Sequence, residues 1–187
     1  MSRKQYYFDP FDTPIPSTDS ALDKYAEKAN CTVIKNIEDL KYIENSSTLV
    51  IDGHSGKGID IFASAFQNPK QRFSGMQLAT RIQAKLPKGH FKIRLLACSG
   101  GTAVAPAMAK WLGNFGFKNI AVGGYMHTVW HGSGHRSLID DDKHDLPWEN
   151  TTNSGAIVWF DCKGKKTVKP EVKSDPETYN PAFPSSY

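Results

Sequence analysis

Residues 47–54, Ser-Thr-Leu-Val-Ile-Asp-Gly-His, contain the stretch that decides how this chain is expected to fold. Leu49, Val50 and Ile51 follow one another without a polar residue between them, which is typical of a strand buried on both faces. A second buried strand is predicted from Phe91 to Ala97, which contains Ile93, Leu95 and Leu96. Strands buried on both faces occur mainly in parallel sheets covered by helices, so the two stretches predict the centre of an α/β domain.

The segments around these two strands alternate between strand-like and helix-like patterns. Ser74 is expected to cap a helix, because Gln77 stands where the third residue of a capping box reaches back to the cap. Further strands are predicted at 31–35, from 120 onward and at 156–161, and further helices at 20–30, 37–44 and 102–115. This alternation predicts a three-layer α/β fold in which a mostly parallel central sheet is flanked by helices.

The two ends of the chain differ from its middle in composition. Both ends are rich in proline, so we expect an extended N-terminal arm over 1–17, a Pro-rich C-terminal tail over 170–187 and one domain over 18–169. Within the domain, the polar segment 126–153 is expected to be a loop excursion. Loops of that length in a compact domain are usually functional.

Composition excludes several classes of function. The formal net charge is +4, but no basic run is interleaved with aromatic residues, so nucleic acid is not an expected partner. No window holds the roughly 18 apolar residues of a membrane span, and the first residues lack the apolar region of a Sec signal peptide. Three cysteines, Cys31, Cys98 and Cys162, indicate a reducing compartment rather than a disulfide framework. We therefore expect a cytoplasmic protein or one exported by a leader-independent route.

Two reactive side chains, His54 and Cys98, each follow one of the predicted core strands directly. The carboxyl ends of parallel strands meet at one edge of a sheet, where ligands of open α/β folds bind. Both residues stand in glycine-rich turns, whose backbone N–H groups can remain unpaired and face a carbonyl oxygen. A thiol is a usable nucleophile near neutral pH, and imidazole suits proton transfer there. The pattern indicates a nucleophile, Cys98, with an acid/base partner, His54.

The blocks Leu49-Val-Ile-Asp-Gly-His54-Ser and Ile93-Arg-Leu-Leu-Ala-Cys98-Ser-Gly resemble those of the caspase-like cysteine peptidases. That clan includes caspases, legumains, gingipains and the autoprocessing domains of large bacterial toxins. The 44 residues between His54 and Cys98 are close to the spacing of about 50 in caspases. The toxin domains are the most similar, because Leu78-Ala79 lies between the blocks as a Leu-Ala pair does there. Ser55 replaces the glycine that usually follows the histidine, and Leu96 and Ser99 replace residues that flank the caspase cysteine.

The resemblance, which covers roughly residues 47–165, implies a caspase/hemoglobinase-like fold and a cysteine endopeptidase of effector or toxin type that cleaves a protein or peptide substrate. It implies backbone oxyanion contacts from Ser55 and Cys98, and a pocket for the residue before the scissile bond lined by Gly123, Gly124 and Tyr125. No cofactor is required by this chemistry. Because inositol hexakisphosphate activates the toxin domains, an inositol polyphosphate is a candidate activator. The basic residues considered for it are Arg94, Lys163, Lys165 and Lys166.

Three alternatives remain open at this stage. Gly53-His-Ser-Gly-Lys57 approaches the nucleophile elbow of serine hydrolases, with Ser55 as nucleophile and Asp141 or Asp145 with His144 as partners, but Lys57 stands in place of the last glycine. The His-rich segment 127–144 contains His127, His131, His135 and His144 with Asp140 to Asp142, and could hold a metal or be a polar surface loop. A third alternative is a binding or regulatory module that keeps the peptidase fold without cleaving anything.

Overall fold

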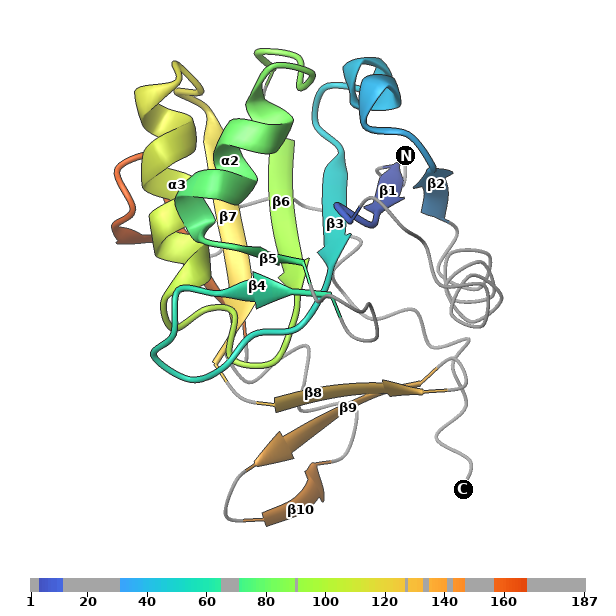
Figure 1. Cartoon of the computed structure of the whole chain (residues 1–187), viewed down its shortest axis with the longest axis vertical. Coiled ribbons are helices and arrows are strands. Elements are labelled where there is room, and N and C mark those ends of the chain that lie inside the picture. The colour runs from blue at the N-terminus through green and yellow to red at the C-terminus, as the bar shows by residue number, and fades with distance from the viewer. Residues whose placement is uncertain are drawn as a thin grey trace.

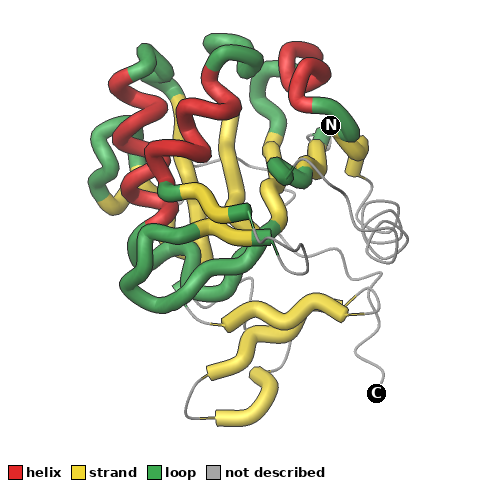
Figure 2. The backbone as a smooth tube through the Cα atoms, in the orientation of Figure 1, coloured by secondary structure: helices red, strands yellow, loops and turns green. Residues whose placement is uncertain are grey.

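The structure is a computed structural model of the whole chain, and its elements are labelled in Figure 1. It describes residues 4–11, 31–64, 71–89, 91–126, 128–132, 135–140, 143–146 and 157–167, which carry the colours in Figure 2. Side chains are described in these ranges except for residues 128–146, Cys31 and Phe91, of which the backbone alone is described.

The central element is a seven-stranded sheet whose strand order is β12-β11-β7-β6-β3-β1-β2. The strands are β1 (Gln5–Phe8), β2 (Cys31–Ile34), β3 (Thr48–Asp52), β6 (Phe91–Leu96), β7 (Ile120–Tyr125), β11 (Ile157–Phe160) and β12 (Lys166–Thr167). The five strands from β7 to β2 run parallel, whereas β11 is antiparallel to β7 and β12 is antiparallel to β11. The predicted α/β class with a mostly parallel sheet is therefore confirmed.

Two helices, α2 (Gly75–Gln83) and α3 (Val104–Asn114), lie side by side across one face of this sheet (Figure 1). The helix α2 begins as predicted: Ser74 accepts a hydrogen bond from the Gln77 N–H, and the Gln77 side chain accepts one from the Ser74 N–H. The predicted helix at 37–44 is the 3-10 helix η1 (Ile37–Tyr42). A short hairpin of β4 (Phe62–Ala63) and β5 (Arg72–Phe73) connects the loop after β3 to α2.

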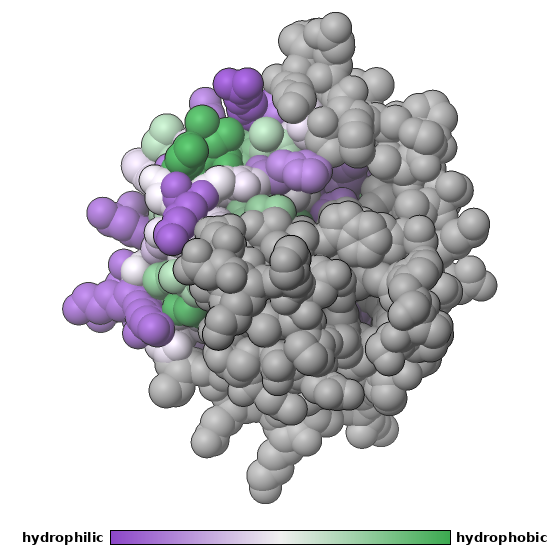
Figure 3. Space-filling view, turned by 90° about the horizontal axis from the view of Figure 1, so that it is seen from below, coloured by the Kyte–Doolittle hydropathy of each residue, from purple (hydrophilic) through white to green (hydrophobic). Residues whose placement is uncertain are grey.

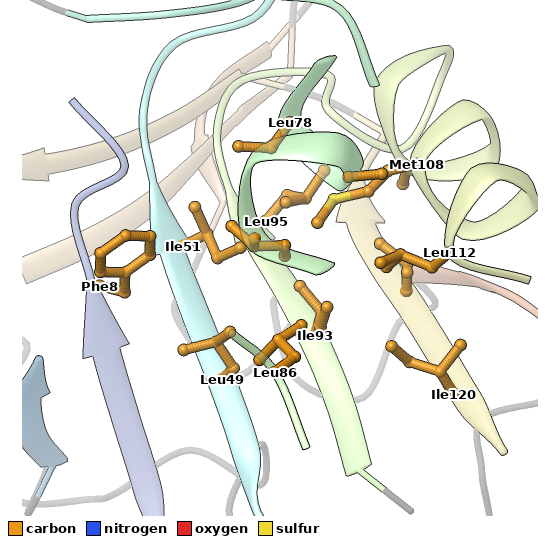
Figure 4. Close-up of a cluster of buried hydrophobic side chains, with 14 of the residues drawn as sticks. Phe8, Leu49, Ile51, Leu78, Leu86, Ile93, Leu95, Met108, Leu112 and Ile120 are labelled. Carbon is orange, nitrogen blue, oxygen red and sulfur yellow. The ribbon is translucent and has the colours of Figure 1, made fainter. Parts of the chain in front are cut away.

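The hydrophobic core fills the space between the sheet and these two helices (Figure 4). The strands contribute alternate residues, such as Ile51 of β3 and Leu95 of β6, and the helices contribute Leu78 and Met108, all without solvent exposure. Burying one such side chain contributes about 1.5–3 kcal/mol. The remaining residues of each strand, such as Val50, point to the opposite face because side chains alternate along a strand.

The expectation that residues 1–17 form an arm beside the domain was wrong for Gln5–Phe8. These four residues are strand β1, which lies between β2 and β3, and all four are buried. Tyr6 and Phe8 belong to the core that the helices cover. Two aromatic side chains on the helix-covered face supply enough apolar surface to hold a strand in place, although prolines follow it closely in sequence.

The expectation of a loop excursion over 126–153 was also wrong for the residues of this range that form strands. Residues 128–146 contribute a three-stranded antiparallel sheet of β8 (Thr128–Gly132), β9 (His135–Asp140) and β10 (Lys143–Leu146). β-branched and aromatic residues such as Val129 and Trp130, followed within a few residues by Gly132 and Gly134, are typical of a hairpin. This strand pattern was overlooked because most of the segment is polar.

Two predicted segments lie outside the described residues, namely the helix at 20–30 and the tail at 170–187. In the part of the chain that the structure describes, no helix combines the length and the apolar character needed to cross a membrane.

Replacing Thr48 by Val is expected to stabilise the protein. Thr48 is fully buried in β3, and its hydroxyl has no hydrogen-bond partner. Valine keeps the shape and the β-branching but removes an unsatisfied polar group, so we expect unfolding to cost about 1 kcal/mol more in urea titrations. Thr48→Ala, which leaves a cavity, should destabilise the protein instead. A loss of stability in Thr48→Val would contradict the burial of an unpaired hydroxyl.

Candidate active site

The pairing of β3 with β6 determines where His54 and Cys98 lie. Thr48 is paired with Lys92 and Asp52 with Leu96, so the residue numbers of each pair differ by 44. His54 and Cys98 differ by the same number and each stands two residues beyond the last pair. The Gly53 N–H continues the ladder by donating to the Leu96 carbonyl oxygen at 3.3 Å. His54 and Cys98 therefore follow the same paired positions of two adjacent strands, which lie about 4.8 Å apart in a sheet.

Side-chain alternation shows which face the strand positions before His54 and Cys98 point to. Ile51 and Leu95 point toward the helices, and so does the position of Gly53, where a Cβ would lie 2.4 Å from Phe62 Cε1. Residues at even positions of β3 and β6 therefore point to the other face. His54 is exposed and Cys98 is half-buried, so both can be reached from solvent.

The backbone of His54 is held by the hairpin that follows it. The His54 N–H donates to the Ala63 carbonyl oxygen, and the Ala63 N–H donates to the His54 carbonyl oxygen, both at 2.8 Å. The adjacent Phe62 is fully buried and its ring occupies the space beside Gly53. The glycine before the histidine is thus explained by packing, since any side chain at Gly53 would displace this ring.

The turn after Cys98 is tightly wound. Ser99 has a φ of 50°, in the left-handed region that non-glycine residues rarely adopt. The Gly100 N–H donates to the Ala97 carbonyl oxygen at 3.3 Å and the Thr102 N–H to the Ser99 carbonyl oxygen at 3.0 Å. Backbone strain of this kind costs about 1–3 kcal/mol and is maintained only where the surroundings hold the chain in place.

The end of β7 supplies that support. The Gly101 N–H donates to the Tyr125 carbonyl oxygen at 2.8 Å. A Cβ on Gly101 would lie 2.3 Å from the Gly124 carbonyl oxygen, and a Cβ on Gly124 would lie 2.4 Å from the Gly101 nitrogen. Two glycines that face each other let the backbones touch, so the turn of Cys98 is packed directly against the third core strand.

The residues expected to form the substrate pocket lie beside this turn. Gly123 is covered by the ring of Trp159, whose Cε3 atom would be 2.8 Å from a Cβ at that position. Gly124 touches the Cys98 turn as described, and Tyr125 is buried. The three residues thus lie at the same edge as Cys98, and their role in a pocket stays a prediction.

Ser55 directly follows the histidine, and its side-chain oxygen is buried without a hydrogen-bond partner. Among the described residues, none accepts a hydrogen bond from the Ser55 N–H. The amide is therefore available for the oxyanion contact expected of it, whereas the hydroxyl is poorly placed for the nucleophilic role of the serine-hydrolase alternative. The oxyanion contacts from the Ser55 and Cys98 backbone stay predictions.

The four basic residues considered for a polyphosphate do not share one surface. Arg94 is buried in β6 on the face away from α2 and α3. Lys163, Lys165 and Lys166 are exposed at the turn between β11 and β12. Lys166 pairs with Phe160, which packs against the core under the helices. Paired residues point to the same face of a sheet, so Lys166 lies on the helix-covered face and Arg94 on the other one.

The neighbour of Arg94 on its own face is Lys92, which sequence analysis did not single out. Both are buried, the Arg94 Nε has no hydrogen-bond partner, and the Lys92 Nζ lies 5.5 Å from the centre of the Trp159 ring. Alternation along the strand could have identified this pair.

The metal alternative concerns residues whose side chains fall outside the described part of the chain. These are His127, His131, His135 and His144 with Asp140 to Asp142. Elsewhere, among the described side chains, no group of three or more His, Cys, Asp or Glu is arranged to hold a metal ion. Cys162 is a free thiol, half-buried at the far side of α3, where its carbonyl group touches Gly113.

One contact at the site was missed by sequence reasoning because it joins two loops. The Gly58 N–H, in the loop after His54, donates to the Thr102 Oγ1 at 2.9 Å. The Thr102 hydroxyl in turn donates to the Ser99 carbonyl oxygen at 2.7 Å. Threonine before a helix predicts a cap, and no local pattern indicates a partner 44 residues earlier in the sequence.

Comparisons with known proteins add no assignment. No protein-family model matches the chain, and no curated protein is significantly similar to it.

The contact between the two glycines predicts different outcomes for neighbouring substitutions. Gly101→Ala forces a methyl group into the Gly124 backbone and should cost about 1–3 kcal/mol of stability. Gly100→Ala is the matched control, because its nearest neighbour would be the Ala97 carbonyl oxygen at 3.4 Å, an ordinary contact. Thermal unfolding followed by circular dichroism compares the two variants. Equal melting temperatures would show that the turn does not pack against β7 in this way.

Proposed function

We propose that the protein is a cysteine endopeptidase in which Cys98 is the nucleophile and His54 is the acid/base. The observation that supports this proposal is the register of β3 and β6, in which Asp52 pairs with Leu96, so that His54 and Cys98 each follow this pair by two residues at the same edge of the sheet. Exposure of His54 and partial exposure of Cys98 support it, since a substrate must reach both.

The chemistry follows from the two side chains. The Cys98 thiolate attacks the carbonyl carbon of the scissile peptide bond, and the carbonyl oxygen gains the negative charge. Backbone N–H groups at the two turns, with Ser55 the available one, stabilise that charge. As the carbon–nitrogen bond breaks, protonated His54 gives its proton to the leaving amine. Neutral His54 then takes a proton from water, whose oxygen attacks the thioester carbon; the carbon–sulfur bond breaks, the acid is released, and the Cys98 thiolate and protonated His54 are restored.

The finer fold assignment belongs to the same proposal. A mostly parallel sheet with a histidine after one central strand and a cysteine after the next is the arrangement that the caspase-like resemblance implies. The antiparallel strand β11 beside β7 and the helices α2 and α3 on one face are compatible with a three-layer architecture. We infer that the chain has this fold.

Cys98 is a better candidate than Ser55 for the nucleophile. The Ser55 hydroxyl oxygen is buried, and a hydroxyl requires a base in contact to become nucleophilic. Cys98 is half-buried and follows β6 by two residues, as His54 follows the adjacent strand β3. These observations favour thiol chemistry over the serine-hydrolase alternative.

Cleavage of a diverse peptide library, with sites read by mass spectrometry, tests the proposal. The purified wild type should cut peptides, Cys98→Ala should lose cleavage entirely, and His54→Ala should be slower by about 100- to 10,000-fold. Each protein is assayed with and without inositol hexakisphosphate, since the neighbouring cations Arg94 and Lys92 are candidate ligands for a polyphosphate activator. Cleavage that persists in Cys98→Ala would refute the proposal, and Ser55→Ala serves as the matched control at the alternative nucleophile.

Labelling with a thiol-reactive peptide probe separates an enzyme from an inactive module of the same fold. In a peptidase, Cys98 should react much faster than Cys162, and this advantage should disappear in His54→Ala, because the imidazole assists the thiol. Peptide mapping after a short exposure identifies the labelled residues. Similar slow labelling of Cys31, Cys98 and Cys162 would instead favour a binding or regulatory module.

A further inference from the structure

The loop that follows His54 is fixed at two points, although it is exposed. The Gly58 N–H donates to the Thr102 Oγ1 at 2.9 Å, and the Asp60 Oδ1 accepts from the N–H of Gly75, the first residue of α2, at 2.7 Å. Figure 1 shows this loop running below α3 before it turns into β4. A loop held at two points presents the side chains near them in fixed positions.

The first of these anchors belongs to the turn of the candidate nucleophile. Thr102 stands two residues before α3, yet the helix has Ala103 at its N-cap and no side-chain cap. The Thr102 hydroxyl bonds to Gly58 and to the Ser99 carbonyl group instead. A helix without a side-chain cap is less stable by about 1 kcal/mol. The Thr102 hydroxyl thus links the two loops and does not cap α3.

The anchored loop carries exposed apolar side chains. Ile59 is 50% exposed and Ile61 is 37% exposed, and Met76, at the start of α2 beside the second anchor, is 41% exposed. Among the described residues one further large hydrophobic side chain is exposed, Tyr42 of η1, which lies at the opposite, amino-terminal edge of β3. Figure 3 views the molecule from below, and in the described part of this face hydrophobic surface appears among hydrophilic residues.

The proposed reaction determines which part of the substrate is expected to contact this loop. The acyl part of the substrate is bonded to Cys98, whereas the leaving amine must be next to His54, which protonates it. The chain beyond the amine therefore passes over His54 and the residues that follow it. Apolar side chains at this place gain free energy when an apolar substrate side chain covers them, about 25 cal/mol per Å².

We propose that residues 56–61 form the binding surface for the leaving-group part of the substrate. In this proposal, which rests on the proposed peptidase function, Ile59 and Ile61 contact an apolar side chain located shortly after the scissile bond. Thr102 is a positioning residue, because its hydroxyl couples this surface to the turn of Cys98. The substrate class is a polypeptide with an apolar residue on the leaving side.

The first experiment compares Ile59→Ser/Ile61→Ser with Tyr42→Ser, the exposed apolar control at the other edge. Wild-type cleavage sites should be enriched in apolar residues at one position after the scissile bond. The double variant should lose this enrichment, with kcat/KM about tenfold lower for the preferred peptide and unchanged for a peptide with a polar residue at that position. Tyr42→Ser should behave as wild type.

The second experiment concerns the anchor. Thr102→Val removes both side-chain bonds but keeps the Thr102 N–H bond to Ser99 that closes the turn. We expect a higher KM for the preferred peptide, normal alkylation of Cys98 by iodoacetamide, which does not contact the loop, and recovery in Thr102→Ser. A merely structural role would lower the melting temperature and slow both reactions together.

The outcomes distinguish failure of the binding-surface proposal from failure of the peptidase proposal. If the wild type cleaves peptides but the double isoleucine variant keeps the wild-type preference, the surface assignment is refuted and the peptidase stands. If Thr102→Ser is as impaired as Thr102→Val, the positioning role of the hydroxyl is refuted. If the wild type cleaves no peptide under any condition, both the peptidase and the surface assignment are refuted.

Discussion

The parallel hydrogen-bonded ladder between β3 and β6 is the constraint on which the rest of this edge depends. A shift of one residue would move every side chain of a strand to the other face of the sheet. The observed register keeps Leu49 and Ile51 under the helices together with Ile93 and Leu95, so the burial of apolar side chains fixes it. The same register brings the ends of β3 and β6 level, so the packing of the core also positions the turns that hold His54 and Cys98.

A second contact fixes the orientation of the turn that holds Cys98. The backbone of Gly101 lies against that of Gly124 at the end of β7, so three adjacent strands, β3, β6 and β7, contribute to one edge. Close packing of backbones makes this region intolerant of side chains. The site is therefore built on rigid elements, which is the condition for holding reacting groups within a fraction of an ångström.

Sequence reasoning succeeded where the signal is local. The apolar residues of 49–51 and of 91–97 predicted β3 and β6, and the Ser74–Gln77 pair predicted the start of α2. It failed for β1, because the pairing of Gln5–Phe8 with β2 and β3 is a tertiary contact that four residues cannot reveal. At the site, the positions of His54 and Cys98 follow from strand ends, whereas the bond between Gly58 and Thr102 joins residues 44 apart and has no sequence signature.

Several departures from the most stable arrangement occur close together at the carboxyl edge. Ser99 adopts a left-handed backbone, the Ser55 hydroxyl is buried without a partner, and α3 starts without a side-chain cap. Each costs on the order of 1 kcal/mol, and a sequence selected for stability alone would remove them by single substitutions. Proteins retain such costs where function requires a particular geometry. The strain around His54 and Cys98 therefore supports a chemical role for this edge independently of the identity of its two reactive side chains.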